Sequence, residues 1–183
     1  MSLDGVVSAP ERLLPLRDDE AKRYAVAELE EFDAFVFGRV TYEAFAARWP
    51  HVRDDPFADA LDRLPKYVAS RTLRELSWTG STRLDGDVAA QIAALKRRPG
   101  KHLMKYGVGA LDRTLLAHGL IDELRISLVP IVLGEGRPLL HGLDPSLQPK
   151  LELSDTKRFS NGILRLTYAV ASSSNATPRR ESS

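Results

Sequence analysis

The sequence predicts a single α/β domain, a sandwich built on a mostly parallel sheet with antiparallel strands at one edge. Over the first two-thirds of the 183 residues, short apolar runs alternate with segments of helical spacing, which is typical of βα units and a parallel sheet. Near the C-terminus, two runs of alternating polarity flank Asn161-Gly162, the strongest short-range signal of a β-hairpin. We expect the domain to occupy residues 1–170. Residues 171–183 contain no large apolar side chain and are expected to form a disordered tail.

Composition and charge exclude several classes of function. The chain has 26 basic and 25 acidic residues and a net charge of +1, which gives no reason to propose nucleic acid or an anionic membrane as partner. It has no cysteine, so disulfides, thiolate catalysis and cysteine-ligated zinc are excluded. The four histidines are scattered and indicate no metal site. No apolar run approaches the length of a membrane span, and a cytoplasmic enzyme or binding protein is expected.

Capping residues and short apolar runs predict the elements. Short polar side chains accept hydrogen bonds from the free N–H groups that begin a helix. The expected caps are Asp18, Thr41, Asp55 and Asp87. Residues 9–17 contain two prolines and are expected to form a loop. The expected strands are Ala34–Phe37, Lys66–Ser70, Thr82–Leu84, His102–Tyr106, Glu123–Val129 and the hairpin Leu151–Phe159 with Gly162–Val170.

The segment His102–Leu116 combines a strand, a glycine turn and a helix. Gly107 and Gly109 separate the apolar run from the helical pattern that begins at Ala110. Glycines at such a turn allow backbone N–H groups to approach a ligand closely, and the start of the helix carries partial positive charge. The turn therefore suits a phosphate or pyrophosphate. Because the full dinucleotide fingerprint has a third glycine, an ordinary tight turn remains the alternative.

Polar and glycine residues follow three of the predicted parallel strands. They are Gly38-Arg39, Ser70-Arg71-Thr72 and Gly107-x-Gly109. Ligands of open α/β sheets bind at the carboxyl ends of the parallel strands, so we expect these groups to converge. Arg39 and Arg71 could each bind a phosphate through two hydrogen bonds, and the alternative for each is a surface salt bridge. Together these groups favour a ligand rich in phosphate.

Seven motifs in this order resemble a known family. They are Ser2-Leu3-Asp4-Gly5, Phe37-Gly38-Arg39-x-Thr41-Tyr42, Pro65-Lys66-Tyr67-Val68-x-Ser70-Arg71-Thr72, Gly107-x-Gly109-x-Leu111, Leu120-Ile121-Asp122-Glu123-Leu124, Pro130-Ile131-Val132-Leu133-Gly134-x-Gly136 and Phe159-Ser160-Asn161-Gly162. The set resembles the dihydrofolate reductase-like superfamily. It is most similar to the branch named for the C-terminal reductase domain of the bifunctional riboflavin-biosynthesis enzyme, the RibD C-terminal domain. The resemblance covers about residues 1–170.

The resemblance implies a three-layer sandwich with a mixed sheet, a homodimer and an NADPH-dependent reductase. The reaction would be hydride transfer to a C=N or C=O bond of a small heterocycle, either a ribosylamino-pyrimidine or a pterin. Leu3 and Asp4 would lie near the nicotinamide. The residues that would bind the rest of the cofactor are Gly38, Arg39 and Thr41 at the phosphates, Ser70, Arg71 and Thr72 at the adenosine end, and Gly107, Val108, Gly109, Ala110 and Leu111 at the pyrophosphate. Arg71 is the candidate for the 2′-phosphate.

Four residues are candidates for the proton donor and for the substrate contacts. Asp4 is the candidate catalytic acid, and the alternative is that it only forms the Asp-Gly turn. Glu123 is the other acidic residue expected near the site. Tyr42 and Trp49 are candidates for stacking on the substrate, with a role in the core as the alternative.

Two further expectations concern the start of the chain and the function class. Members of the family usually have a strand, central to the sheet, before the Ser-Leu-Asp-Gly motif. Here that motif follows Met1 directly, so we expect Met1 to correspond to an internal methionine and the neighbours of that strand to be unpaired or re-paired. A nucleotide-binding protein without turnover, or a plain interaction domain, remains an alternative to the reductase.

Overall fold

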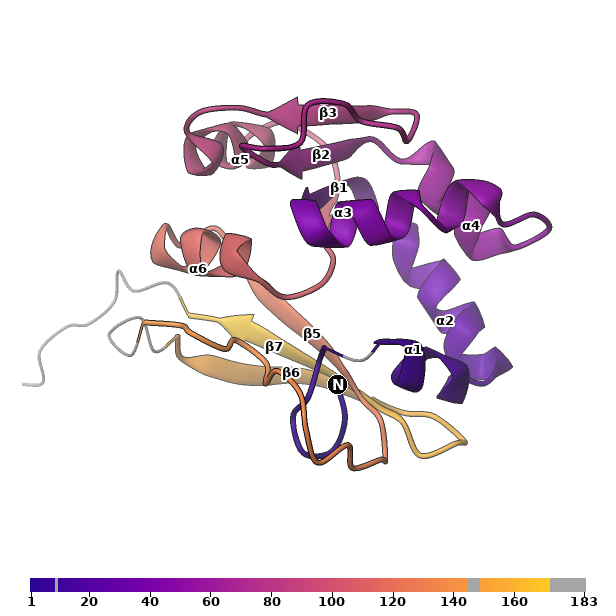
Figure 1. Cartoon of the computed structure of the whole chain (residues 1–183). Helices are drawn as coiled ribbons and strands as arrows, with labels where there is room; N and C mark the ends of the chain where they lie inside the picture. Colours follow the sequence, from indigo (N-terminus) through magenta and orange to yellow (C-terminus); the bar gives the residue numbers. More distant parts are fainter. Residues whose placement is uncertain (9, 145–148, 172–183) are drawn as a thin grey trace, which may run out of the picture.

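A four-stranded parallel sheet and a three-stranded antiparallel sheet form the framework of the protein (Figure 1). The computed structural model describes residues 1–8, 10–144 and 149–171. The parallel sheet has the order β3-β2-β1-β4, with β1 (Phe32–Gly38), β2 (Lys66–Ala69), β3 (Ser81–Leu84) and β4 (His102–Lys105). The antiparallel sheet has the order β5-β7-β6, with β5 (Glu123–Leu128), β6 (Leu151–Arg158) and β7 (Leu164–Val170). The predicted fold class and the C-terminal hairpin are confirmed, and residues 172–183 of the predicted tail, 171–183, lie outside the described residues.

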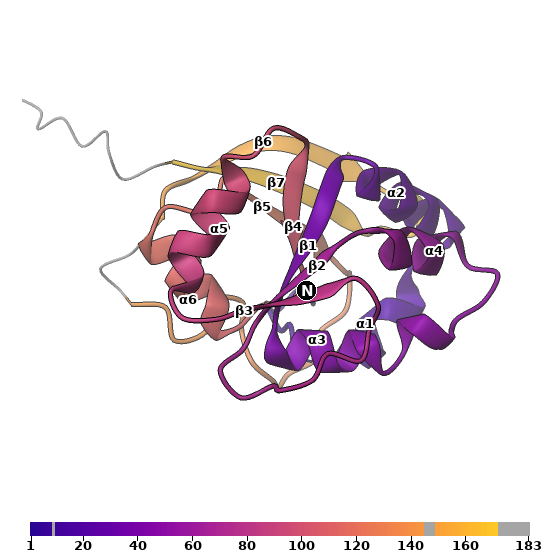
Figure 2. The ribbon, with the colours of Figure 1, turned by 90° about the horizontal axis from the view of Figure 1, so that it is seen from above.

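Helices cover both faces of the parallel sheet, as Figure 2 shows. They are α1 (Pro10–Leu13), α2 (Asp19–Leu29), α3 (Arg39–Ala46), α4 (Pro56–Arg63), α5 (Val88–Lys96) and α6 (Ala110–Ala117), with 3₁₀ turns at Leu14–Leu16 and Trp49–His51. Three predicted caps are confirmed, because the carboxylates of Asp18, Asp55 and Asp87 accept hydrogen bonds from N–H groups in the first turn of their helices. Within the described part of the chain, no helix combines the length and apolar character that crossing a membrane requires.

Two local predictions are wrong. Thr41 does not cap α3, because the helix already begins at Arg39 and Gly38 occupies the cap position. The expected loop before Asp18 contains α1 and a 3₁₀ turn instead. Proline is tolerated at the first position of a helix, where its missing N–H would have no partner, so Pro10 begins α1 rather than preventing it.

Strand β1 organises the core. Its side chains alternate, so Phe35 and Phe37 pack with the helices α2 to α4 on one face, whereas Val36 packs with Ile92 of α5 and Leu115 of α6 on the other. All three β1 side chains are buried. The result is the expected three-layer arrangement, in which an apolar strand reads as a continuous run because both of its faces are covered.

The two sheets share no strand ladder in the described residues, and β4 and β5 each end their sheet with an open edge. A cleft of about 650 Å³, here called the inter-sheet cleft, is lined by residues of both edges and by α5 and α6. Met1 lies at its end, where its ammonium group donates to the Ser127 carbonyl and its carbonyl accepts from the Val129 N–H, both at 2.8 Å. In the described residues, the β4 and β5 edges thus face the cleft without a strand partner, apart from the contacts of Met1 with Ser127 and Val129.

Candidate functional site

The structure brings three of the predicted strand ends together. Gly38 at the end of β1 lies opposite Ala69 at the end of β2, and Val36 of β1 lies opposite Lys105 at the end of β4. Because these strands are parallel, the segments that follow them leave the sheet at the same edge. The groups at residues 38–39, 70–72 and 107–109 therefore border one surface.

Gly107 packs directly against the first turn of α3. Its φ of +72° lies in the left-handed region that favours glycine, and a Cβ built there would lie 2.5 Å from Thr41 Oγ1. A Cβ at Gly38 would lie 3.9 Å from the Cβ of Leu111. The glycine turn, the start of α3 and the start of α6 thus form one packed unit. Glycine is required at residue 107 by the backbone conformation and by the close contact with Thr41.

Gly109 is different, because its backbone is extended and open on its outer side. It is the N-cap of α6, with φ −175°, and a Cβ built there would meet no described atom within 4 Å. The N–H groups of Ala110 and Leu111 follow in the first turn of α6, where no carbonyl of the same helix can accept from them. Free N–H groups, the partial positive charge of the helix start and an unobstructed approach fit a phosphate group.

The loop after β2 is held by a buried hydroxyl. Ser70 Oγ accepts hydrogen bonds from the N–H groups of Thr72 at 3.2 Å and Leu73 at 2.9 Å. The side chains of Arg71 and Thr72 are exposed beside it. Arg39, by contrast, forms an exposed ion pair with Glu43, 2.9 Å away and one turn further along α3. Of the two predicted arginines, Arg39 therefore has the surface salt bridge that was the alternative.

Asp4 joins two loops. Its carboxylate accepts from the Leu133 and Gly134 N–H groups at 3.2 and 2.8 Å. Hydrogen bonding with Ser2, and with those two N–H groups, lowers the pKa of Asp4 to about 2. A carboxyl group with this pKa is ionised at neutral pH and has no proton to donate. The hydrogen bonds to Leu133 and Gly134 give Asp4 a structural role, in which it joins its own turn to the loop at residues 133–134. The neighbouring Leu3 side chain is exposed.

The three predicted substrate residues lie elsewhere. Tyr42 is buried in the core, and its hydroxyl accepts from the Trp78 N–H at 3.0 Å. Trp49 packs between the rings of Phe45 and Phe57. We therefore leave both out of the proposed substrate site.

Glu123 is the first residue of β5, and its carboxylate pairs with Arg125 at 2.9 Å. Arg125 also pairs with Glu31, whose carbonyl accepts from the N–H of His102 at the start of β4. Gly107 follows the opposite end of β4. The structure thus separates Glu123 from the glycine turn by the length of a strand.

A second cavity of about 240 Å³ contains polar groups that sequence reasoning missed. Tyr106, which precedes Gly107, lines it together with Glu28 and Arg165. The buried Glu28 carboxylate accepts from Arg165 at 2.5 Å and from Arg125 at 3.2 Å. Arg165 also donates to Ser127 Oγ at 3.2 Å, while its buried Nε has no hydrogen-bond partner in the described residues. The residues that line the cavity thus carry a carboxylate, a guanidinium and a phenol.

The chain is similar to several known proteins. The chain is 31% identical over 144 residues to the uncharacterized protein YyaP of Bacillus subtilis, covering 76% of this chain and 75% of that one. The crystal structure of a protein of Shewanella sp. PV-4 named for riboflavin biosynthesis superposes with a TM-score of 0.74 at 24% identity, covering 94% and 96% of the two chains. Dihydrofolate reductase of Enterococcus faecalis, complexed with NADP(H), has the same fold, with a TM-score of 0.61 at 14% identity and coverage of 94% and 93%. The family model of the RibD C-terminal domain matches residues 1–165, and the chain belongs to this family.

Proposed function

We propose that the protein is an NADPH-dependent reductase that transfers a hydride to a C=N or C=O bond of a small heterocycle. The observation that carries the proposal is the open glycine turn at the start of α6, where Gly109 leaves free N–H groups accessible beside the ends of β1 and β2. The family supports the same assignment, as does the likeness in fold to a reductase complexed with NADP(H).

The residues around the turn would hold the cofactor in distinct ways. The N–H groups of Val108, Ala110 and Leu111 would bind the pyrophosphate, as helix starts do for anions, and Gly109 would leave the approach to them open. Gly38, Arg39 and Thr41 would border the phosphates, with Arg39 exchanging its exposed partner Glu43 for the ligand. Ser70 would hold the loop, and the exposed Arg71 and Thr72 would bind the adenosine end, with Arg71 at the 2′-phosphate. When bound, NADPH supplies the hydride from its nicotinamide ring.

The second cavity would hold the substrate. The residues that line it suit a heterocycle that carries both donors and acceptors, such as a pyrimidine, because they include the carboxylate of Glu28, the guanidinium of Arg165 and the phenol of Tyr106. Burial raises the pKa of Tyr106, so its phenol stays protonated at neutral pH and can donate a hydrogen bond to the substrate. Because Asp4 is ionised, the proton that accompanies the hydride would come from water.

The family name and the Shewanella relative support a ribosylamino-pyrimidine of riboflavin biosynthesis as substrate, and the dihydrofolate reductase fold supports a pterin. Both are small reducible heterocycles. A cytoplasmic location and a homodimer remain predictions.

Turnover distinguishes a reductase from a protein that only binds the nucleotide. We expect the loss of NADPH absorbance to depend on added ribosylamino-pyrimidine or dihydropterin, with no loss when the heterocycle is omitted. NADPH binding without oxidation, across both substrate classes, would support the alternative of binding without turnover and reject the reductase.

A further inference from the structure

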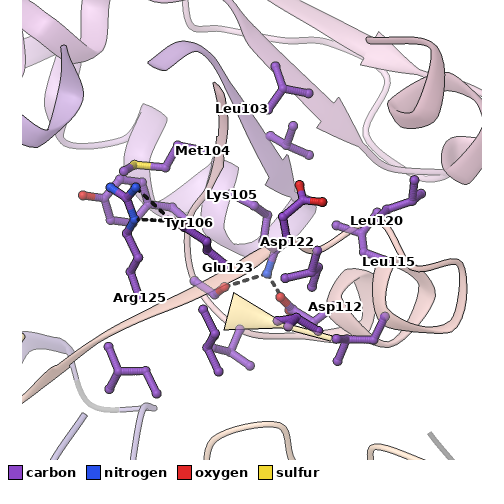
Figure 3. A pocket seen from close by; sticks show the side chains of 18 of the residues that line it. Leu103, Met104, Lys105, Tyr106, Asp112, Leu115, Leu120, Asp122, Glu123 and Arg125 are labelled. Atoms are coloured by element: carbon purple, nitrogen blue, oxygen red, sulfur yellow. Dashed lines mark hydrogen bonds and ion pairs between the residues drawn. The ribbon is translucent and has the colours of Figure 1, made fainter. Parts of the chain in front are cut away.

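A buried ion pair joins the two elements on either side of the glycine turn. Lys105 is the last residue of β4 and Asp112 is the third residue of α6. Their side chains are only 16% and 10% exposed, and Lys105 Nζ lies 2.5 Å from Asp112 Oδ2. Figure 3 shows the pair at the wall of the inter-sheet cleft. Burial of two charges is costly unless each has further partners, so their other contacts are informative.

Both side chains bind the backbone of the turn. Lys105 Nζ donates to the Gly107 carbonyl at 2.6 Å, and Asp112 Oδ2 accepts from the Gly109 N–H at 2.6 Å. Arg137 from a distant loop donates to the Val108 carbonyl at 3.3 Å. Two successive carbonyl oxygens of the turn are therefore each held by a cation, and the next N–H is held by a carboxylate.

These contacts fix the direction of the remaining N–H groups. In a planar trans peptide the C=O and the N–H point in opposite directions. Holding the Gly107 carbonyl toward Lys105 therefore directs the Val108 N–H to the other side. A phosphate is bound by N–H groups and repelled by carbonyl oxygens, so the orientation of this one peptide decides whether the turn attracts or repels an anion.

The pair also controls the charge beneath the turn. An unpaired Asp112 carboxylate in the first turn of α6 would oppose the positive end of the helix and repel a phosphate. Lys105 neutralises it at 2.5 Å. The turn thus keeps its backbone N–H groups without a net negative charge behind them.

We propose that Lys105 and Asp112 are positioning residues that hold the glycine turn in its anion-binding conformation without themselves contacting the ligand. The inference rests on the proposed function, because it takes the pyrophosphate of NADPH as the anion. It assigns to a buried ion pair a role in affinity for the cofactor rather than in stability alone.

The double variant Lys105→Met/Asp112→Leu tests this role. It replaces both charges by apolar side chains of similar size, a change that is often neutral or stabilising for a buried pair. We expect its Tm to stay within a few degrees of the wild type, and its Kd for NADPH, measured by titration calorimetry, to rise at least tenfold. In turnover, the KM for NADPH should rise while kcat changes little. A folded double variant that binds NADPH as the wild type does would overturn the inference.

Two single variants keep the test decisive if the double variant is unstable. Lys105→Gln retains an N–H donor for the Gly107 carbonyl and should bind NADPH more tightly than Lys105→Met, which retains none. Equal Kd values for these two variants would show that the hydrogen bond to the Gly107 carbonyl does not affect NADPH binding. Lys22→Met, which removes an exposed ion pair with Asp19 on α2, is the matched control and should leave the Kd unchanged. Failure of the wild type itself to bind NADPH would reject the proposed function, whereas wild-type binding with an unaffected double variant rejects this inference alone.

Discussion

Gly109→Val is expected to weaken NADPH binding about a hundredfold or more, because it removes two or more hydrogen bonds to a charged phosphate, each worth about 1.5–3 kcal/mol. The new side chain would occupy the open space in front of the first turn of α6, where a Cβ meets no described atom within 4 Å. The extended backbone at φ −175° accepts any residue, so the Tm should not change. Titration calorimetry and thermal unfolding measure the two effects separately.

Two further variants are to be compared with Gly109→Val. Ala117→Val, at the exposed far end of the same helix, adds a similar side chain away from the turn and should change neither the Kd nor the Tm. Gly107→Ala should lower the Tm, because its Cβ would lie 2.5 Å from Thr41 Oγ1 at a φ of +72°. A Gly109→Val protein that is stable and retains wild-type affinity would show that NADPH does not bind at the start of α6.

A short apolar segment fused to Met1 is expected to raise the Tm, which is the second large effect. The hydrogen bonds of Met1 with Ser127 and Val129 are those of a parallel bridge. The adjacent Ser2 also pairs in parallel with Val129. Backbone groups alternate in direction along a strand, so the second residue before Met1 would accept from the Ser127 N–H and donate to the Arg125 carbonyl. An extended segment that continues backwards from Met1 would thus follow the open edge of β5.

The other edge of the fused segment would form backbone hydrogen bonds with the open edge of β4. The His102 N–H points toward β1, where it donates to the Glu31 carbonyl, so the backbone groups of Leu103 and Lys105 point to the cleft. Five residues of Val and Ile would bury branched side chains worth ~1.5–3 kcal/mol each, against ~1–2 kcal/mol each for ordering the backbone. Mid-range values of about 2.3 and about 1.5 kcal/mol per residue leave a net gain of roughly 4 kcal/mol, which corresponds to a rise in Tm of about 8–15 °C.

A Gly-Ser extension of the same length is the control for this experiment, because it adds backbone without apolar side chains. Thermal unfolding followed by circular dichroism gives the Tm of both fusions. Equal Tm values for the two would mean that the inter-sheet cleft does not accept a strand.

Local chemistry explains which parts of the fold could be predicted. Asp18, Asp55 and Asp87 each act within three residues of their own position, so the helix starts follow from short sequence. The turn at Asn161-Gly162 likewise needs only the positive φ of Gly162, +85°. The prediction that Thr41 caps α3 was wrong because Gly38, which ends β1, already occupies the cap position. In the sequence, a Thr in the first turn has the same local signature as a cap.

In the candidate site too, some residues could be found from the local sequence pattern and others could not. The glycine turn is contiguous, so its residues could be found from the strand–glycine–helix pattern. Glu28 and Arg165 are 137 positions apart, and in the sequence each is an ordinary charged residue on an amphipathic element. Tyr42 is an aromatic residue next to a predicted site, and the sequence pattern suggested that it contacts the substrate. It is buried instead, and its hydroxyl bonds to Trp78, 36 positions away. Burial and long-range pairing, rather than local pattern, decided these roles.

The most direct test of the account is a titration of the purified wild-type protein with NADPH and, separately, with NADH, followed by quenching of tryptophan fluorescence. We expect saturable binding of NADPH and a clear preference over NADH, because the exposed Arg71 beside the adenosine end would pair with the 2′-phosphate. Absence of NADPH binding by a protein that circular dichroism shows to be folded would contradict it.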